Sequence, residues 1–280
     1  MDLHAAPPVE TRAGRHVAQA TDVDPFRIET PGLRVRMASS AEDHAAILAL
    51  RAQAFRGRDP EMSEQDAFDP ICAHVLVEAR ADTAEGPAGQ VLAAFRLLHL
   101  RSAAALGTSY AAQFYDLSRL TRFRGGMAEI GRFCVAEKCR DADVPRLAWA
   151  GLTRFVDAED VQLLFGCASF PGTDPTPHAA ALDWLALHHQ APERWRIGPR
   201  AAETHRYADA MHRQEAPGRG DGQAGLRALP PLLRSYLALG GWVSDHAVID
   251  RDLGTLHVFT GVEIARIPPG RARALRRLAG

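Results

Sequence analysis

The sequence predicts an α/β (α+β) fold in which helices flank a central sheet, and two patterns carry this prediction. Short apolar runs rich in β-branched and aromatic residues recur along the chain, and such runs are typical of strands buried in a sheet. Between them lie segments whose apolar residues repeat at the spacing of a helix. The 280 residues suffice for one sizeable core with an extension.

The chain divides into three expected parts. Residues 1–30 are polar with Pro and Gly and predict a loosely ordered arm. Residues 31–265 hold the strand and helix patterns of one domain. Residues 266–280 form a basic tail, in which arginines recur up to 277 without an acidic residue. This tail either contacts anionic lipid or is a frayed, solvated end, and the sequence leaves both open.

Composition and charge exclude several classes of protein. Hydrophobic residues make up 46% and charged residues 24%, as in ordinary soluble domains. The net charge of -1 provides no field that would attract nucleic acid. No apolar run is long enough to span a membrane, and the first residues lack a secretory signal. Four cysteines without a Cys-x-x-Cys pair predict no metal site and fit reduced thiols in the cytoplasm.

The N-terminal half is predicted from alternation, capping and turn signals. Ser40 and Asp43 form a capping box at the start of a helix, whose inward stripe includes Arg51 and Phe55. The expected elements are an edge strand (32–37), this helix (40–55), a flexible acidic loop (56–73), a strand pair (74–78 and 89–98) and a short helix or cover segment (109–120).

The C-terminal half follows the same logic. A buried strand is followed by a loop and a helix, then by a second buried strand. The expected elements are a strand (127–135), a helix (145–159), a strand (161–170), a helix (177–190), a surface loop (212–224), an apolar helix within 226–239 that starts near Pro230, and a strand pair (247–249 and 255–259).

The strand at 127–135 is unusual because it carries Glu129 and Arg132 within an apolar run. Buried charges cost several kcal/mol unless they are paired or used. The pair is therefore either a structural ion pair or part of a reaction cleft. Side chains alternate along a strand, so residues three apart point to opposite faces. The two residues share a cleft only if the strand is bulged, and we expect a bulge near Gly131.

Seven sequence blocks, in order from about residue 32 to 250, resemble the acyltransferases that attach a 3-hydroxy fatty acyl group to the α-amine of ornithine. Glu129-Ile130-Gly131-Arg132-x-Cys134-Val135 is the central block. The others are Leu50-Arg51-x-x-x-Phe55, Phe68-Asp69-x-x-Cys72-x-His74-Val75-Leu76-Val77, Phe95-Arg96-Leu97-Leu98, Phe114-Tyr115-Asp116-Leu117-Ser118, Phe165-Gly166-Cys167-Ala168-Ser169-Phe170-Pro171-Gly172-Thr173-Asp174-Pro175 and Leu229-Pro230-Pro231-Leu232-Leu233-x-x-Tyr236-Leu237. Phe133 departs from this family, which more often has Ser there.

The resemblance implies a GNAT fold, with a central mixed twisted sheet, flanking helices and a C-terminal extension. It implies Glu129 as the base and Arg132 as its catalytic neighbour. The residues it implies for the acceptor are Arg51, Phe55, Asp69, Arg96 and Ser169, and the division of roles among the arginines stays open. Ornithine has a distal ammonium group that needs a carboxylate, for which Asp69 is the first candidate and Asp66 the second.

The donor implied by the resemblance is the phosphopantetheine thioester of acyl carrier protein, with no bound cofactor. The glycine-rich loop that holds coenzyme A in this fold is missing, and Lys138-Cys139-Arg140-Asp141-Ala142-Asp143 stands in its place. This departure argues against tight binding of free coenzyme A. Lys138, Arg140 and Arg146 are the candidate contacts for the carrier or its phosphate. The product would be lyso-ornithine lipid, made in the cytoplasm, with peripheral contact at the inner membrane left open.

Three alternatives remain at the sequence level. The first is the same reaction with glutamine or another amino acid as the acceptor, since small differences near Asp69 would suffice to change the acceptor. An acyl-homoserine lactone synthase also fits Glu129-x-x-Arg132-Phe133, although those enzymes carry a Trp soon after the first helix, and here the first is Trp149. A non-enzymatic, membrane-acting protein of the haemolysin-like type is the third alternative.

Overall fold

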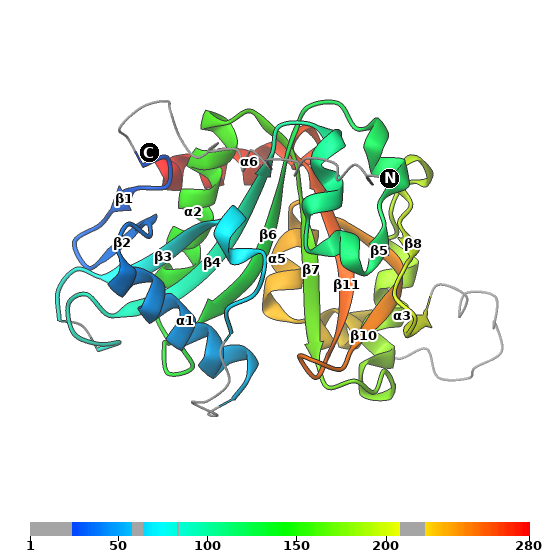
Figure 1. Ribbon diagram of the computed structural model, residues 1–280, viewed down its shortest axis with the longest axis horizontal. Helices are drawn as coiled ribbons and strands as arrows, with labels where there is room; N and C mark the ends of the chain where they lie inside the picture. Colours follow the sequence, from blue (N-terminus) through cyan, green and yellow to red (C-terminus); the bar gives the residue numbers. More distant parts are fainter. Residues whose placement is uncertain (1–23, 58–63, 83, 208–221) are drawn as a thin grey trace, which may run out of the picture.

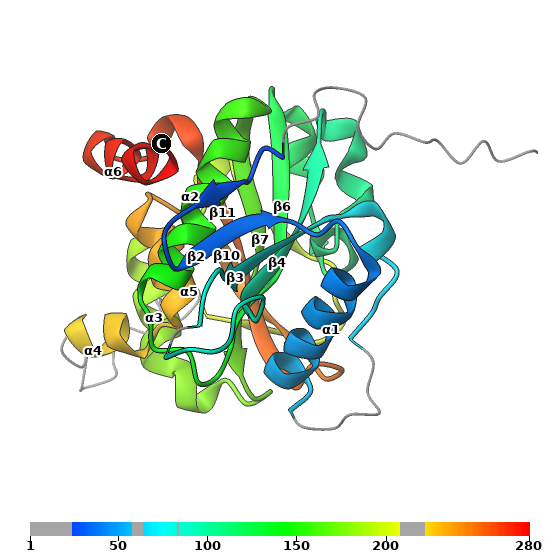
Figure 2. The ribbon, with the colours of Figure 1, turned by 90° about the vertical axis from the view of Figure 1, so that its left-hand side faces the viewer.

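A twisted sheet runs through the molecule and is covered by helices on both faces (Figures 1 and 2). The computed structural model describes residues 24–57, 64–82, 84–207 and 222–280. Within them, nine strands form the main sheet in the order β1-β2-β3-β4-β6-β7-β11-β10-β9. Their bounds are β1 (Ile28–Glu29), β2 (Leu33–Met37), β3 (Ala73–Ala79), β4 (Val91–Leu100), β6 (Gly126–Val135), β7 (Val161–Pro171), β9 (Thr204–Arg206), β10 (Trp242–Asp250) and β11 (Thr255–Glu263).

The helices lie in two layers. Helix α1 covers one face, and α2, α3, α5 and α6 lie on the opposite side (Figure 2). Their bounds are α1 (Ala41–Phe55), α2 (Asp143–Ala158), α3 (Ala179–His188), α4 (Gly222–Ala228), α5 (Pro231–Ala238) and α6 (Pro269–Ala279). The short strands β5 (Tyr115–Asp116) and β8 (Gly198–Pro199) pair separately. The mixed sheet with flanking helices is the fold that was predicted.

Strands β6 and β7 form a splayed pair. They run parallel and pair from Gly126 and Val161 as far as Ile130 and Gly166. Beyond this point β6 continues along β4 and β7 continues along β11, so the two strands part. A Cβ at Gly166 would lie 2.3 Å from the carbonyl oxygen of Ile130, so the two backbones approach too closely there for any side chain. The splay opens the sheet toward the C-terminal ends of both strands.

A β-bulge interrupts β6 at the predicted place. Arg96 of β4 pairs with Gly131, whereas Ala94 pairs with Cys134, so β6 has one extra residue in this interval. The positive φ of 52° belongs to Arg132 and not to Gly131, which had been expected to permit the bulge. The extra residue breaks the alternation, and Arg132 therefore lies on the same face as Glu129.

The core is built from the predicted apolar faces. Ser40 caps α1 through the expected capping box with Asp43, and Ile47 and Leu50 pack on the sheet. On the other face, α2 packs against β2 to β4. The hairpins β3–β4 and β10–β11 are antiparallel, as predicted.

Several segments are more ordered than the sequence suggested. Residues 24–30, assigned to a loose arm, include β1 and the fully buried Phe26, which stacks on Phe155; residues 1–23 lie outside the described part. The stretch 64–72 was expected to be a flexible loop, but Glu64 and Asp69 are buried. Residues 58–63 of that loop lie outside the described residues.

Two predicted helical stretches differ in detail from the structure. Residues 109–120 form the 3-10 helix η3 (Ala111–Gln113), strand β5 and the start of η4 (Ser118–Arg122), not one helix. In the apolar stretch 226–239, the helix predicted to start near Pro230 is confirmed as α5, since proline suits the first turn of a helix. The separate helix α4, which ends at Ala228, was not predicted.

The basic tail was expected to be a frayed end or a lipid contact. It begins at the last residue of η8 (Ile264–Arg266) and contains α6, which packs on α2 and pairs Arg276 with Asp157. This docking excludes the frayed end over Pro269–Ala279 and leaves lipid contact untested.

Candidate active site

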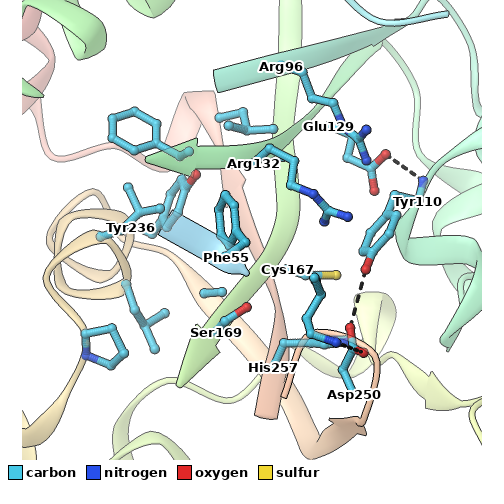
Figure 3. A pocket seen from close by; sticks show the side chains of 18 of the residues that line it. Phe55, Arg96, Tyr110, Glu129, Arg132, Cys167, Ser169, Tyr236, Asp250 and His257 are labelled. Carbon is cyan, nitrogen blue, oxygen red and sulfur yellow. Dashed lines mark hydrogen bonds between the residues drawn. The ribbon is translucent and has the colours of Figure 1, made fainter. Parts of the chain in front are cut away.

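A cavity of about 210 Å³ lies where β6 and β7 part, with α5 along one side (Figure 3). Its polar wall contains six ionisable side chains besides two cysteines: Arg96, Tyr110, Glu129, Arg132, Asp250 and His257. Its apolar wall includes Phe55, Ile130, Phe133, Leu232, Leu233 and Tyr236. A cavity with both a charged and an apolar wall can hold a polar substrate group next to an acyl chain.

Glu129 is almost fully buried, with 5% of its surface exposed, yet it lines this cavity. The backbone N–H groups of Tyr110 and Ala111 each donate to one of its carboxylate oxygens at 2.7 Å. Burial raises the pKa of Glu129 to about 7, against the opposing effect of these two hydrogen bonds. A carboxyl group with such a pKa is suited to exchange protons near neutral pH.

Arg132 points into the same cavity but does not pair with Glu129 (Figure 3). Its Nε donates to Glu64 at 2.9 Å, and its Nη2 donates to Asp66 at 3.2 Å. Its guanidinium also lies 5.1 Å from the centre of the Tyr110 ring. The structural ion pair between Glu129 and Arg132, considered from the sequence, is therefore absent, and each residue has other partners.

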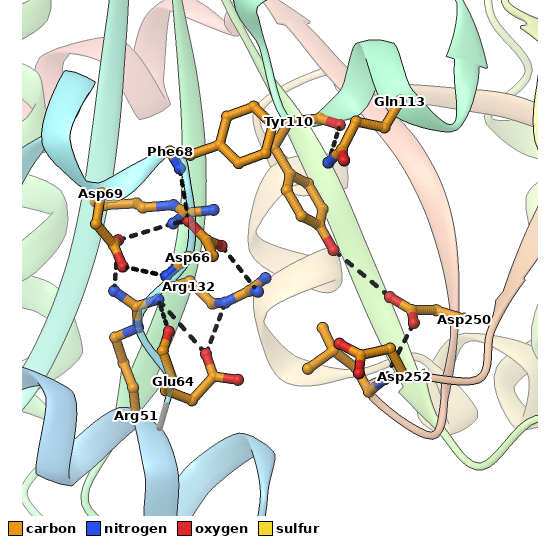
Figure 4. Close-up of polar contacts among 12 residues, drawn as sticks. Arg51, Glu64, Asp66, Phe68, Asp69, Tyr110, Gln113, Arg132, Asp250 and Asp252 are labelled. Carbon is orange, nitrogen blue, oxygen red and sulfur yellow. Dashed lines mark hydrogen bonds and ion pairs between the residues drawn. The ribbon is translucent and has the colours of Figure 1, made fainter. Parts of the chain in front are cut away.

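The segment 64–69 supplies carboxylates for four arginines, which are Arg51, Arg56, Arg96 and Arg132. Figure 4 shows the part of this network around Arg51 and Arg132. Asp69 accepts hydrogen bonds from Arg51 at 2.7 Å and from Arg96 at 2.8 Å. Burial would raise the pKa of Asp69, but the hydrogen bonds from these arginines bring it down to about 2. Arg96 was expected to pair with Glu129, Asp69 or substrate, and Asp69 is its partner, together with Asp66.

This network changes what the predicted acceptor residues can do. Neither Arg51 nor Asp69 lines the cavity, and the carboxylate of Asp69 is already held by two guanidinium groups. Asp69 is thus a poor partner for a substrate ammonium, as is Asp66, which pairs with two arginines. Phe55, Arg96 and Ser169 do line the cavity, as the sequence blocks implied.

The three candidate donor contacts lie apart from the cavity wall. Lys138 and Arg140 are exposed on the loop after β6, and Arg146 is exposed on the first turns of α2. Arg146 pairs with Asp143, and the guanidinium of Arg140 donates to the carbonyl of Glu137. This loop continues from the end of β6 at which the sheet splays open.

Three cavity residues escaped the sequence reasoning: Tyr110, Asp250 and His257. Asp250 stands between a predicted strand and its turn, which is a frequent place for a functional polar residue, but nothing local marked it. Burial lowers the pKa of His257 to about 4, so this ring is neutral at pH 7. Its Nδ1 lies 2.9 Å from the hydroxyl of Tyr115.

The cysteines do not offer an activated nucleophile. Cys72 and Cys167 line the cavity, but burial raises the pKa of Cys167 well above that of a free thiol. The described residues contain no cluster of His, Cys, Asp and Glu that would hold a metal ion. They also contain no helix that is long and apolar enough to cross a membrane.

Comparison with known proteins shows the family of this chain. Residues 49–150 match the model of the acetyltransferase (GNAT) domain. The chain is 36% identical to an L-ornithine N(alpha)-acyltransferase of Rhodobacter capsulatus, over 80% of this chain and 87% of that protein. The chain belongs to the L-ornithine N(alpha)-acyltransferase family. It is therefore an acyltransferase with the GNAT fold, and the non-enzymatic alternative falls.

Two further members of this family show similar coverage. The chain is 34% identical to a protein of the same name from Brucella abortus, over 84% of this chain and 85% of that one. The corresponding protein of Rhizobium meliloti is 32% identical, over 84% and 81%. Among solved structures, the N-acyl amino acid synthase FeeM from uncultured soil microbes covers 89% of this chain, with 8% identity and a TM-score of 0.47. That likeness is too low to inform the site.

Proposed function

We propose that this protein transfers a 3-hydroxy fatty acyl group from acyl carrier protein to the α-amine of ornithine, giving lyso-ornithine lipid. The observation that carries the proposal is the position of Glu129, a carboxyl group with a pKa of about 7 in a cavity beside a β-bulge. The names of the relatives at 32–36% identity support ornithine as the acceptor. Acyl transfer to an amine needs a base, an aligned thioester and a place for negative charge.

Glu129 removes the proton from the α-ammonium group, directly or through water. The free amine then attacks the thioester carbonyl carbon and forms a C–N bond. The tetrahedral oxyanion collapses and the C–S bond breaks. The new amide nitrogen loses its second proton, and the departing pantetheine thiolate takes up a proton. The products are the amide and the free thiol of the carrier. Both oxygens of Glu129 are fixed by backbone N–H groups, so the base is oriented before the substrate arrives.

The bulge supplies a candidate oxyanion site. Residues 132 and 133 have no paired position on β4, which frees their backbone from the regular ladder. A backbone N–H aimed at the carbonyl oxygen of the thioester is worth about 10²- to 10³-fold in rate. Arg132 lies at the same point, and its guanidinium is our candidate for the acceptor carboxylate. We do not assign Arg51 this direct role, because it is not among the residues that line the cavity.

The donor enters, in this proposal, from the end at which β6 and β7 part. The loop with Lys138 and Arg140 lies at this end, and Arg146 follows on α2. Exposed basic residues attract the acidic surface of an acyl carrier protein and its phosphate. Neither the splayed strands nor this loop requires a bound cofactor, since the carrier brings the pantetheine arm with it.

The test compares donors and acceptors with purified protein. We expect 3-hydroxyacyl-acyl carrier protein and ornithine to give N-acylornithine, identified by mass spectrometry, and the matching coenzyme A thioester to react at least about tenfold more slowly. Glutamine in place of ornithine tests the second acceptor. S-adenosylmethionine tests the lactone synthase, for which a lactone would be the product. A lipid profile of a heterologous host then reports head group and acyl chain together. Absence of any acylated amino acid would refute the proposal.

A further inference from the structure

We propose that Asp250 binds the distal ammonium group of the acceptor and so selects amino acids with a cationic side chain. This inference rests on the proposed function and adds the residue that recognises the acceptor. Asp250 ends β10, at the turn to β11, and its side chain lines the same cavity as Glu129 (Figure 3).

Asp250 is a buried carboxylate that has no cationic partner among the described residues. Only 6% of its surface is exposed, and it forms no ion pair with the residues that the structure describes. Its Oδ1 accepts a hydrogen bond from the backbone N–H of Leu253 at 3.0 Å. Its Oδ2 lies 3.5 Å from the hydroxyl of Tyr110, the outer limit for a hydrogen bond. A buried charge so weakly matched gains from a bound cation.

The neighbouring groups leave this charge uncompensated. His257 has its pKa lowered to about 4 by burial, so the ring beside Asp250 is neutral at pH 7. The cavity arginines Arg96 and Arg132 are paired with carboxylates of the segment 64–69. Asp250 is therefore the acidic group of the cavity wall that is left for a substrate cation, since Glu129 is needed as the base.

The spacing of the two carboxylates suits a diamino acid. Glu129 accepts a hydrogen bond from the backbone N–H of Tyr110, and Asp250 lies at the hydroxyl end of the same residue (Figures 3 and 4). The two acids thus lie at opposite ends of Tyr110, with Glu129 2.7 Å from its backbone nitrogen and Asp250 3.5 Å from its hydroxyl oxygen. A short chain with an amine at each end fits between them, with its α-amine at Glu129 and its distal ammonium group at Asp250.

The experiment compares ornithine with norvaline, which has the same carbon chain without the distal amine. In the unaltered protein we expect kcat/KM to be at least about tenfold higher for ornithine. In Asp250→Asn, kcat/KM for ornithine should fall by about 10- to 100-fold, as for loss of a charged hydrogen bond, whereas norvaline changes less than about threefold. Asn retains an oxygen for the N–H of Leu253, so the turn is kept.

Asp252→Asn is the matched control. Asp252 lies two residues further on, its side chain is 76% exposed, and it pairs with Arg56 outside the cavity wall. We expect this variant to keep the preference for ornithine. Asp250→Glu retains the charge and should retain more of the preference than Asp250→Asn does.

Each outcome decides the inference. If the unaltered protein has nearly equal kcat/KM values for ornithine and norvaline, the inference is overturned without any variant. An equal loss of kcat/KM for both acceptors in Asp250→Asn also overturns it. Both results leave the acyltransferase proposal standing, because N-acylated amino acids still form. If the unaltered protein acylates no amino acid from acyl carrier protein, the proposed function and this inference fall together.

Discussion

Replacing Glu129 with Gln tests the base at the centre of the mechanism. The substitution keeps the size of the side chain but removes its ability to take up a proton. We expect kcat to fall by 10²- to 10⁴-fold, the usual contribution of a positioned general base. The assay follows release of the carrier thiol with a thiol-reactive dye, at saturating 3-hydroxyacyl-acyl carrier protein and ornithine.

The pH profile makes this test specific. Because burial raises the pKa of Glu129 to about 7, a larger fraction of the base is ionised as pH rises. In the unaltered protein kcat/KM should rise about tenfold per pH unit below 7 and level off above it. The Gln variant should lack this limb, since its residual activity depends on another group. A change in kcat without a change in the profile would point to a merely structural effect.

Stability provides the control, because Glu129 also holds the backbone at Tyr110 and Ala111. Gln retains one carbonyl acceptor for the two N–H groups, so we expect a loss of about 1–3 kcal/mol. The carboxyl group of Glu129 has a pKa near 4.5 in the unfolded chain and about 7 in the folded protein. The free energy of unfolding should therefore fall by roughly 3 kcal/mol as the pH rises from 4.5 to 7. This fall should be absent in the variant. A folded Gln variant with full activity would refute the assignment of the base.

Three further predictions concern the backbone and the donor. Gly166→Ala should disrupt the splayed pair and cost several kcal/mol in chemical denaturation, because the added methyl meets the carbonyl of Ile130; Gly270→Ala, which has open space in α6, should not destabilise. Arg132→Gly should be about 1 kcal/mol more stable than Arg132→Ala, since position 132 has a positive φ, and equal stability would argue against the bulge. Arg140→Glu should raise KM for acyl carrier protein by more than about threefold while KM for ornithine is unchanged; unaltered carrier kinetics would remove Arg140 from the donor site.

Much of the fold was accessible from local patterns. The capping box of Ser40 and Asp43, the hairpins and the two buried strands follow from spacings within a few residues, and the structure contains all of them. The bulge in β6 was also predictable. An acid and an arginine three residues apart must lie on one face to share a cleft, and only an extra residue permits this.

Local patterns did not show which acidic residues of the loop after α1 pair with which arginines. Glu64 and Arg132 are 68 residues apart, and nothing in the acidic loop distinguished a solvated residue from a buried one. The sequence blocks made Asp69 a candidate substrate contact. In the structure its carboxylate forms ion pairs with Arg51 and Arg96 instead.

The sequence by itself determined most of the elements, the bulged strand and the family, because these depend on periodicity and on ordered short blocks. Only the tertiary structure decided which charges remain free for a substrate. Asp250 and Tyr110 are 140 residues apart and meet only when the β10–β11 turn folds against the segment before η3. Whether a buried carboxylate is paired depends on such distant contacts, and local sequence carries no record of them.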